Sequence, residues 1–534
     1  MYDLLNDRLF TWRGPPGDTQ GSLPELFAAL NAGTVTSLPN IRDHHRQFFH
    51  SFCCQLAAVA PERAGATLAD ITDAKAWRTV LRGLTTDWPN DEPWHLIVED
   101  PTAPAFMQPP LRSAGEMTEL TNDIAEVDTL DLLVTSKNWD VKAARSPVAD
   151  AETWVHHLIT WQTGSGYSGR GWSGIARMNG GYASRPAIGL AWSTDPSTRF
   201  RRDAAVLARA AQTTAEDLAF DREGHALLWC YPWGGTGRES FSLADLHPWF
   251  IEVSRRIRLR DHDGSIAAKA GTTAATRIAA KELNGATGDP WSPIWDDGKT
   301  RKCLTVQGSG WNYRLLCQLL LRAQLSDKGG GDWHPGCALV FDPSLDGDRD
   351  ELQVIGQVLA RGQGQTDGFH ERVITIPTSM AQRLENPGDR AIVLEIARTR
   401  IDTTGTVQNR ILKPAIASVQ QAGRDSVELA KPWAVKQLDA WMQRFDAAVD
   451  ACFFDHLFAS VTRMIDDGAD DRIEDHAWAM HLCDIAQAIL SQAIESTALP
   501  TARRYRAISA ANGRFAAARK KHFPEPTLVA ETAP

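Results

Sequence analysis

Mostly apolar residues recur every three or four positions through much of the last third of the chain. Three series stand out: Leu438, Met442, Phe445, Val449, Cys452 and His456; Trp478, Leu482, Ile485 and Ile489; and Tyr505, Ile508, Asn512 and Phe515. This spacing lines one face of a helix, and Pro432, the stretch Asp466–Gly468 and Pro500 separate the series. With a further helix across Arg390–Arg400, the pattern predicts an all-α four-helix bundle over residues 378–534.

Residues 1–377 show no single period. Helical spacing occurs at Ile41–Ala60, Ala204–Leu218 and Tyr313–Ala323, and β-rich pieces occur at Ala226–Trp229, Phe250–Val253, Ala338–Phe341 and Val373–Ile376. Proline and glycine interrupt this part every few residues, which favours long loops. The predicted fold class is α+β: a large, irregular mixed N-terminal domain with long loops, followed by the C-terminal four-helix bundle.

Composition narrows the class of protein. Of the 534 residues, 43% are hydrophobic and 23% are charged, which excludes a disordered chain or a fibre and suggests about two to four globular domains. The apolar runs are shorter than the roughly 18 residues of a membrane span, and acidic residues stand where a secretory signal would be basic. The eight cysteines include no C-x-x-C pair. We therefore expect reduced thiols, no bound metal, no membrane partner and a cytoplasmic location.

Charge bears on nucleic-acid binding. The net charge of −10 gives the whole chain no general attraction to nucleic acid, so any such contact requires a local basic patch. One candidate is Arg255–Arg260. The other runs through Arg503, Arg504, Arg506, Arg514, Arg519, Lys520 and Lys521. For each, the alternative is an ordinary solvated surface.

The stretch Gly164–Gly174 matches G-x-G-x-x-G in two overlapping frames. A dinucleotide site needs a buried strand before these glycines and a helix that begins within them. Because the glycines continue and are followed by Asn179-Gly180-Gly181, no helix can begin cleanly there. The other interpretation is a loop whose bare backbone approaches a narrow surface, with Arg170 and Arg177 near phosphates.

Two further polar stretches separate apolar ones. Glutamine alternates with glycine in Arg361–Gly368, which predicts a hairpin tip that carries an amide able to contact base edges; a plain exposed turn is the alternative. Lys281 lies in the polar stretch Ala280–Trp291. No complete catalytic motif occurs: Gly298-Lys299-Thr300 lacks the first glycine of a P-loop, and the pairs His44-His45 and His156-His157 lack H-E-x-x-H spacing, which favours core or surface histidines.

In their order and spacing, these segments resemble a known family, the large subunit (CasA type) of the type I-E CRISPR Cascade surveillance complex. The resemblance starts at Tyr2–Leu5, continues at Ser37–Arg42 and Ala105–Gln108, and takes in the glycine-rich stretch, Lys281, the glutamine–glycine tip and the predicted bundle. It implies a subunit that is not an enzyme. Such a subunit recognises the protospacer-adjacent motif of double-stranded target DNA from the minor groove, opens the duplex and helps recruit a helicase–nuclease.

The resemblance also implies roles for individual positions. Gly166 and Gly169 correspond to a glycine loop that fits a narrow groove. Lys281 corresponds to a lysine that reaches minor-groove acceptors. Gln365 corresponds to a wedge that separates the first target base pair, with Gln363 as the alternative.

A fourth loop and two open alternatives complete these expectations. Lys137 and Asn138 lie in a stretch that resembles the contact with the guide RNA and an adjoining subunit. Some relatives carry a cysteine cluster before the lysine, but Gly264–Ala280 contains no cysteine, so neither a metal nor another cofactor is implied. The alternatives are a nucleotide-dependent enzyme that uses Gly164–Gly174 and a pure scaffold whose bundle only docks partners.

Overall fold

The computed structural model describes residues 2–133, 149–164, 185–273, 275–306, 308–325, 334–336, 338–341, 351–362 and 365–525. Its contacts divide the chain into two compact units. Unit 1 comprises Met1–Trp311 and Gly331–Ala381, and unit 2 comprises Asn312–Gly330 and Gln382–Pro534. The division thus falls between residues 381 and 382, close to the predicted 377 and 378, but the segment from Asn312 joins the helical unit instead of the mixed one.

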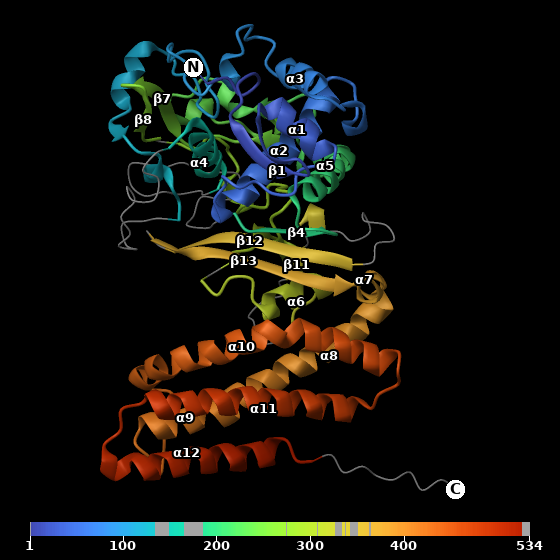
Figure 1. The fold of residues 1–534 in the computed structure, drawn as a ribbon, viewed down its shortest axis with the longest axis vertical. Coiled ribbons are helices and arrows are strands. Elements are labelled where there is room, and N and C mark those ends of the chain that lie inside the picture. The colour runs from blue at the N-terminus through green and yellow to red at the C-terminus, as the bar shows by residue number, and fades with distance from the viewer. Residues whose placement is uncertain are drawn as a thin grey trace. The chain divides into compact units, whose positions relative to one another are not determined.

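Helices form much of the interior of unit 1 (Figure 1). They are α1 (Leu23–Asn31), α2 (Asp43–Arg63), α3 (Ala74–Gly83), α4 (Ala151–Thr163) and α5 (Pro196–Leu218). Helix α2 packs against α3, α4 and α5 and is buried along most of its length. The starts of α4 and α5 follow from sequence, since Asp150 and Asp195 accept hydrogen bonds from Thr153 N and Thr198 N and so cap the first turns.

Small sheets surround these helices. The strand orders are β1-β2, β3-β8-β7, β5-β6, β10-β9-β11 and β13-β12-β4. The strands are β1 (Phe10–Gly14), β2 (Gly17–Gly21), β3 (Asn122–Ile124), β4 (Ala187–Ala191), β5 (His225–Leu227), β6 (Leu246–Ile251), β7 (Arg256–His262), β8 (Ser265–Gly271), β9 (Ile294–Asp296), β10 (Arg301–Cys303), β11 (His334–Gly336), β12 (Glu351–Gly362) and β13 (Gln365–Pro377). The strand predicted at Ala338–Phe341 is wrong, because Leu339–Phe341 forms a 3-10 turn.

Unit 2 is helical. It contains α6 (Tyr313–Leu321), the second half of α7 (Thr378–Glu385), α8 (Pro387–Thr406), a π-helical segment (Val407–Leu412), α9 (Lys413–Gln420), α10 (Pro432–Ile465), α11 (Asp471–Ser496) and α12 (Thr501–His522). The π-helical segment joins α8 directly to α9. It ends just before Pro414, which has no N–H to bond the carbonyl four residues earlier. The predicted order, a mixed part followed by helices, is confirmed.

The buried faces of these helices agree only partly with the predicted series. Leu438, Phe445 and Val449 of α10 are buried, and Trp478 and Leu482 of α11 are buried as predicted. Helix α12 differs: Tyr505 is 84% exposed, and the buried residues are Ala507, Ala511 and Phe515. The small alanine side chains let α12 pack closely on α9 and on the turn that follows it. A Cβ on Gly423 in this turn would lie 2.9 Å from Ala507 N.

No helix in the described ranges has the length and hydrophobicity needed to cross a membrane. The seven cysteines that the structure describes form no disulfide with one another.

Candidate nucleic-acid interface

The glutamine–glycine stretch lies at the end of a long β-hairpin, as predicted. Strands β12 and β13 pair from Glu351 opposite Pro377 to Gly362 opposite Gln365. Near the tip, the register shifts between Ala360 and Arg361, and Gly368 has a φ of 150°, a conformation that favours glycine. Such a bulge increases the local twist and aims the tip. Gln365 begins β13, whereas Gln363 lies outside the described residues.

The hairpin pairs with β4, the strand that follows the glycine-rich stretch (Figure 1). Gln353 pairs with Ala191 and Gln357 pairs with Ala187 in an antiparallel register. Because the strands are antiparallel, β12 continues beyond Gln357 in the direction from which the chain enters β4. At about 3.3 Å per residue, Gly362 lies roughly 16 Å beyond that pair. The end of the hairpin that carries Gln365 and the first residue of β4, Ala187, therefore lie toward the same end of this sheet.

A buried ion pair joins Arg185, which precedes β4, to the stretch that contains Lys281. Arg185 Nε lies 2.6 Å from Asp289 Oδ2, and both residues are buried. Burial alone would lower the pKa of Arg185, but the neighbouring Asp289 carboxylate raises it. Two hydrogen bonds strengthen the junction: Ile188 N donates to Trp291 O at 2.9 Å and Ser292 Oγ donates to Pro186 O at 2.8 Å.

Lys281 is an exposed cation on a short turn. It is the first residue of the 3-10 turn Lys281–Leu283 and its side chain is exposed. Asn284 and Gly285 follow with φ values of 48° and 83°, which reverse the chain. A hydrogen bond from Cys303 N to Asn284 O, at 2.9 Å, connects this turn to strand β10.

The structure thus connects two of the predicted elements to residues 185–191. The hairpin pairs with β4, and the stretch that contains Lys281 contacts Arg185 through Asp289. Gly166, Gly169, Lys137 and Asn138 lie outside the described residues. That the glycine loop, Lys281 and Gln365 converge on one ligand stays a prediction.

Helix α4 separates the two stretches that contain those four residues. The C-terminal cap of α4 is Gly164, where a Cβ would lie 2.6 Å from Thr160 O and 3.0 Å from the Phe48 ring. The described element that leads into the glycine-rich stretch is therefore a helix. A dinucleotide site needs a buried strand there, so α4 does not fit the alternative in which Gly164–Gly174 binds a dinucleotide.

The paired histidines lie in the core, in a polar cluster that spacing along the chain did not reveal. His44 Nε2 lies 2.9 Å from Asp131 Oδ1, and His157 Nε2 lies 3.7 Å from Asp128 Oδ1. Arg42 pairs with Asp128 at 2.9 Å and with Asp131 at 2.7 Å. Although burial would raise the pKa of Asp131, the hydrogen bond from His44 holds it well below the usual range. Burial lowers the pKa of His157 to about 4.

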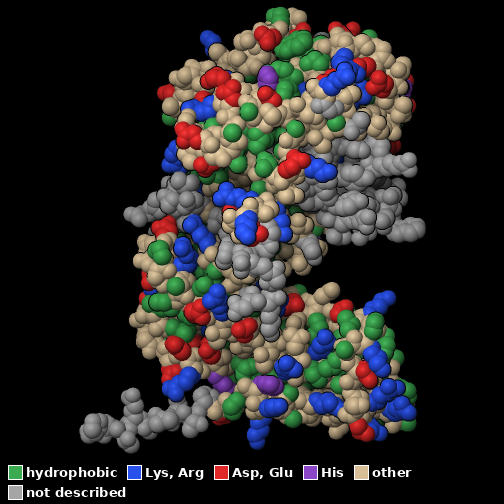
Figure 2. All heavy atoms as spheres, turned by 180° about the vertical axis from the view of Figure 1, so that it is seen from behind, with side chains coloured by type: hydrophobic (Ala, Val, Ile, Leu, Met, Phe, Trp, Pro, Cys, Tyr) green, Lys and Arg blue, Asp and Glu red, His purple; other side chains and the backbone are tan. Residues whose placement is uncertain are grey.

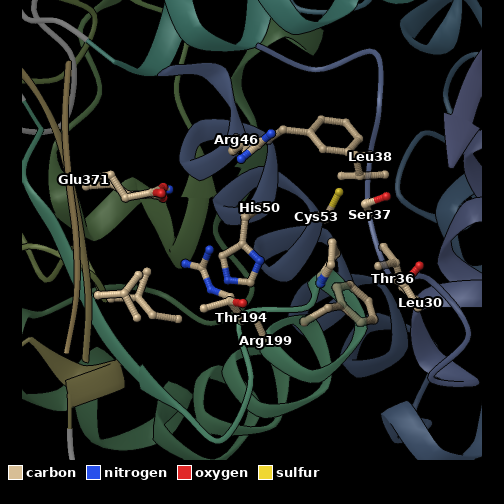
Figure 3. Close-up of a pocket in the computed structure, with 16 residues that line it drawn as sticks. Leu30, Thr36, Ser37, Leu38, Arg46, His50, Cys53, Thr194, Arg199 and Glu371 are labelled. Carbon is tan, nitrogen blue, oxygen red and sulfur yellow. The ribbon is translucent and has the colours of Figure 1, made fainter. Parts of the chain in front are cut away.

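A cavity of about 370 Å³ lies beside the hairpin (Figure 3). Helix α2 contributes Arg46, His50 and Cys53, helix α5 contributes Arg199, and β13 contributes Glu371. The cavity therefore combines cationic and anionic side chains with apolar ones next to the strand that carries Gln365. Its lining comes from segments more than a hundred residues apart, so no local motif could have found it.

The two basic stretches differ in exposure. In β7, Arg256 and Arg258 are buried; Arg258 donates to Ala103 O at 2.9 Å and to Asp100 O at 3.2 Å. The candidate surface at Arg255–Arg260 is therefore wrong for most of its length, because internal acceptors bind its arginines. In α12, by contrast, Arg503 and Arg504 are exposed, and Figure 2 shows lysine and arginine side chains gathered on this part of unit 2.

Comparison with known proteins defines the class of fold. No family model and no curated protein matches the sequence. Solved structures match nearly from end to end, and the proteins they contain share one architecture. The chain has the fold of the CasA (Cse1) proteins, and the resemblance expected from the sequence is confirmed at the level of fold.

The matching structures include CasA of Thermus thermophilus, with a TM-score of 0.62 and 13% identity over 97% of this chain and 99% of that chain. Cse1 of Thermobifida fusca matches with a TM-score of 0.62 and 14% identity over 98% of each chain. A chain of a CRISPR RNA-guided surveillance complex matches with a TM-score of 0.57 and 12% identity, over 97% of this chain and 99% of that one.

Proposed function

We propose that this chain is the large, non-catalytic subunit of a type I-E CRISPR RNA-guided surveillance complex (Cascade). The observation that carries the proposal is the end-to-end similarity in fold to CasA and Cse1, including a chain of an RNA-guided complex. At 12–14% identity this similarity concerns the fold, and the function rests on the candidate interface as well. Its partners in this proposal are guide RNA, the other Cascade subunits, target DNA and a helicase–nuclease, all in the cytoplasm.

The proposed role is to recognise the protospacer-adjacent motif from the minor groove and to begin unwinding. The minor groove is about 6 Å wide, so it admits bare backbone such as that of Gly166 and Gly169 more readily than bulky side chains. Lys281 supplies an ammonium group for the groove acceptors, and Gln365 supplies an inserted amide. The contacts of the hairpin and of the Lys281 stretch with residues 185–191 support this role, because they hold these two stretches next to each other.

The energetics fit a subunit of this kind. Guide–target pairing supplies the sequence specificity, so the protein needs only a short recognition step and a start to strand separation. Unstacking a base step costs a few kcal/mol, which a few charge-assisted hydrogen bonds can offset. The net charge of −10 limits binding to random DNA. In the same complex, Lys137 and Asn138 would face the guide RNA and the adjoining subunit.

Helix α12 offers a second contact surface in this proposal. Arg503, Arg504 and Arg506 are exposed around Tyr505, whose side chain is 84% exposed. Arginine binds phosphates and a tyrosine ring stacks on unpaired bases. The surface would hold the displaced strand or the flanking duplex.

Binding by the assembled complex tests the proposal. The complex is reconstituted with guide RNA and companion subunits, and its affinity is measured for duplexes with randomised flanking sequence. We expect Lys281→Ala and Gln365→Ala each to weaken binding to motif-bearing duplex at least about tenfold, which corresponds to about 1.4 kcal/mol. For a target with a melted segment next to the motif, the same variants should lose much less affinity, because the strands of that target are already separated.

Matched variants control for general damage. Lys299→Ala removes another exposed lysine, and Gln212→Ala removes an exposed glutamine; both should bind like the wild type. Unchanged binding by Lys281→Ala and Gln365→Ala would support the scaffold alternative. Equal losses on duplex and on melted target would contradict a role in unwinding.

A further inference from the structure

Three residues with metal-binding side chains meet between α10 and α11 in unit 2. Cys452 and His456 are four residues apart on α10, so they share one face of that helix. His481 lies on α11. The Sγ atom and the two ring nitrogens all lie within 4.8 Å of one another, and all three residues are half-buried. A small ion can therefore reach the group while the packing of two helices holds it in place.

The distance between two of the ligand atoms matches that in a tetrahedral zinc site. Cys452 Sγ lies 3.5 Å from His481 Nε2, and the rings of His456 and His481 are 4.3 Å apart between centroids. In a tetrahedral site, Zn–S of about 2.3 Å and Zn–N of about 2.0–2.1 Å place sulfur about 3.5 Å from nitrogen. Two of the ligands thus already stand at the distance that a bound ion would impose.

The packing around the three side chains fixes their orientation. The ring of Trp478 lies 5.3 Å from that of His456 and 5.8 Å from that of His481. The guanidinium of Arg400 in turn lies 5.3 Å from the centroid of the Trp478 ring. Cys452 Sγ also lies 3.6 and 3.5 Å from the carbonyls of Ala448 and Val449, within its own helix.

Burial has opposite consequences for metal binding at His456 and at Cys452. Burial lowers the pKa of His456, with further lowering by His481, Arg400 and Arg463 and an opposing effect of Asp455. Its ring is thus neutral at pH 7 and can bind a metal. Burial raises the pKa of the Cys452 thiol, with Asp455 and Asp450 adding to the shift. A bound metal ion must therefore displace the thiol proton.

In the other groups of histidine, cysteine and aspartate among the described residues, side chains of the protein already contact the aspartates. Asp131, which contacts His44 and lies near His157, already pairs with Arg42 at 2.7 Å. Asp203, which contacts His50, also accepts a hydrogen bond from Trp291 Nε1 at 2.9 Å. In these groups, protein cations or donors already bind the carboxylates of Asp131 and Asp203. In the part of the chain that the structure describes, Cys452, His456 and His481 take part in no ion pair.

We propose that Cys452, His456 and His481 bind one Zn²⁺ ion and leave its fourth position to water. One thiolate and two neutral imidazoles are a donor set that Zn²⁺ favours over Mg²⁺ and Ca²⁺, which prefer oxygen. On binding, the Cys452 S–H bond breaks, an S–Zn bond forms and one proton goes to solvent. The ion would link α10 to α11, and this inference does not depend on the proposed function in DNA recognition.

Metal titration of the full chain tests the site. The protein is first treated with a chelator under reducing conditions, and Co²⁺ then serves as a spectroscopic probe for the site. We expect one equivalent to bind, with the visible bands of tetrahedral Co²⁺, a thiolate-to-metal charge-transfer band and release of about one proton per ion. Zn²⁺ should displace the Co²⁺ and raise the midpoint of thermal unfolding.

Variants assign the ligands. Cys452→Ala should abolish the charge-transfer band, and His481→Gln should weaken metal binding at least about tenfold. Cys483→Ala and His476→Gln change a cysteine and a histidine of α11 outside the group, and both should bind like the wild type. Equal binding by Cys452→Ala and the wild type would overturn the proposal.

A measurement on the wild type covers the case in which a variant fails to fold. Zn²⁺ should protect Cys452 from alkylation by a small reagent, as located by mass spectrometry, and should leave the labelling of Cys483 unchanged. Labelling of Cys452 that does not respond to Zn²⁺, together with less than one equivalent of bound Co²⁺, would reduce the group to a thiol–imidazole hydrogen bond and refute the site.

Discussion

Two arginine-rich stretches look alike in the sequence and have opposite fates in the structure. In β7 of unit 1, two arginine side chains turn into the protein, where Arg258 donates to the carbonyls of Ala103 and Asp100 and Arg256 pairs with Glu119 at 2.9 Å. In α12 of unit 2, Arg503 and Arg504 remain in solvent. The difference lies in the surroundings, because β7 is covered by loops while α12 buries only a narrow stripe that includes Ala507 and Ala511.

The comparison separates structural charge from charge that is free to bind. A buried guanidinium has five donors, and its fold must satisfy them with internal acceptors. Once they are satisfied, the group contributes to stability and cannot reach phosphate. An exposed guanidinium contributes little to stability but can bind an anionic partner. Mutation of the buried arginines of β7 should therefore lower stability, whereas mutation of the exposed arginines of α12 should weaken binding.

The largest expected effect is on stability, from Arg258→Ala. The change leaves the buried carbonyls of Ala103 and Asp100 without their donors, and each buried acceptor left unsatisfied costs about 1–3 kcal/mol. We expect unit 1 to lose about 3 kcal/mol of unfolding free energy, measured by urea denaturation followed by circular dichroism. Arg258→Lys should recover only part of it, since one ammonium group cannot span the same acceptors.

Arg260→Ala, on the same strand, is the matched control. The Arg260 side chain is 44% exposed and pairs with the exposed Asp123 at 3.2 Å, so its loss should cost less than about 1 kcal/mol. Similar losses of unfolding free energy in Arg258→Ala and Arg260→Ala would contradict the proposed difference between buried and exposed arginines.

The next largest effect is a dependence of stability on pH, which arises from a buried histidine of unit 1. His156 is buried against the Phe49 ring, 4.9 Å away, and burial lowers its pKa to about 3, whereas the pKa in an unfolded chain is about 6.5. As the pH falls below about 6.5, the unfolded chain takes up a proton that the folded one refuses, so the unfolding free energy falls. Between about pH 7 and pH 5 the expected loss is about 2 kcal/mol.

His156→Phe should remove the contribution of this residue, because the new side chain does not titrate and suits the apolar contact with Phe49, while the buried His157 keeps its own contribution. Urea denaturation at pH 7 and at pH 5 measures the difference. His262→Phe, which changes an exposed histidine of β7, should leave the dependence unchanged. An unaltered slope in His156→Phe would show that burial of this imidazole is not its source.

The sequence predicted those features that depend on neighbours along the chain. The three- and four-residue spacing found α10 and α11 because large side chains such as Phe445 and Trp478 fill their buried faces. The hairpin was predictable because glutamine and glycine interrupt two β-rich stretches. In α12 the prediction failed because small alanine side chains make the close contact with α9. The pattern relies on large apolar residues, but the larger Tyr505 lies in solvent.

The rest depended on contacts between distant segments. The acceptors of Arg258 lie about 150 residues earlier in the chain, and Asp131 meets His44 from 87 residues away, so neither partner shows in a local pattern. Cys452 and His481 meet across two helices. The junction of Arg185 with Asp289 likewise required the fold, although the stretches on either side of it were singled out from the sequence.

The smallest effect on stability, and a selective effect on binding, is expected for α12. Arg503→Ala combined with Arg504→Ala should change the unfolding free energy by less than about 0.5 kcal/mol, because both side chains are exposed. If the reconstituted complex uses this surface for the displaced strand, the same change should reduce the dependence of log Kd on log salt by about one to two, since two phosphate contacts are lost. Tyr505→Ala should weaken binding by about 1 kcal/mol with little change in salt dependence, because stacking is not a charge interaction.

The control is Arg472→Ala, which removes an exposed arginine of α11 that pairs with Asp470. It should alter neither the affinity for DNA nor its salt dependence. Binding that is unchanged in the α12 variants would leave its exposed arginines without a role in nucleic-acid contact and would confine recognition to unit 1.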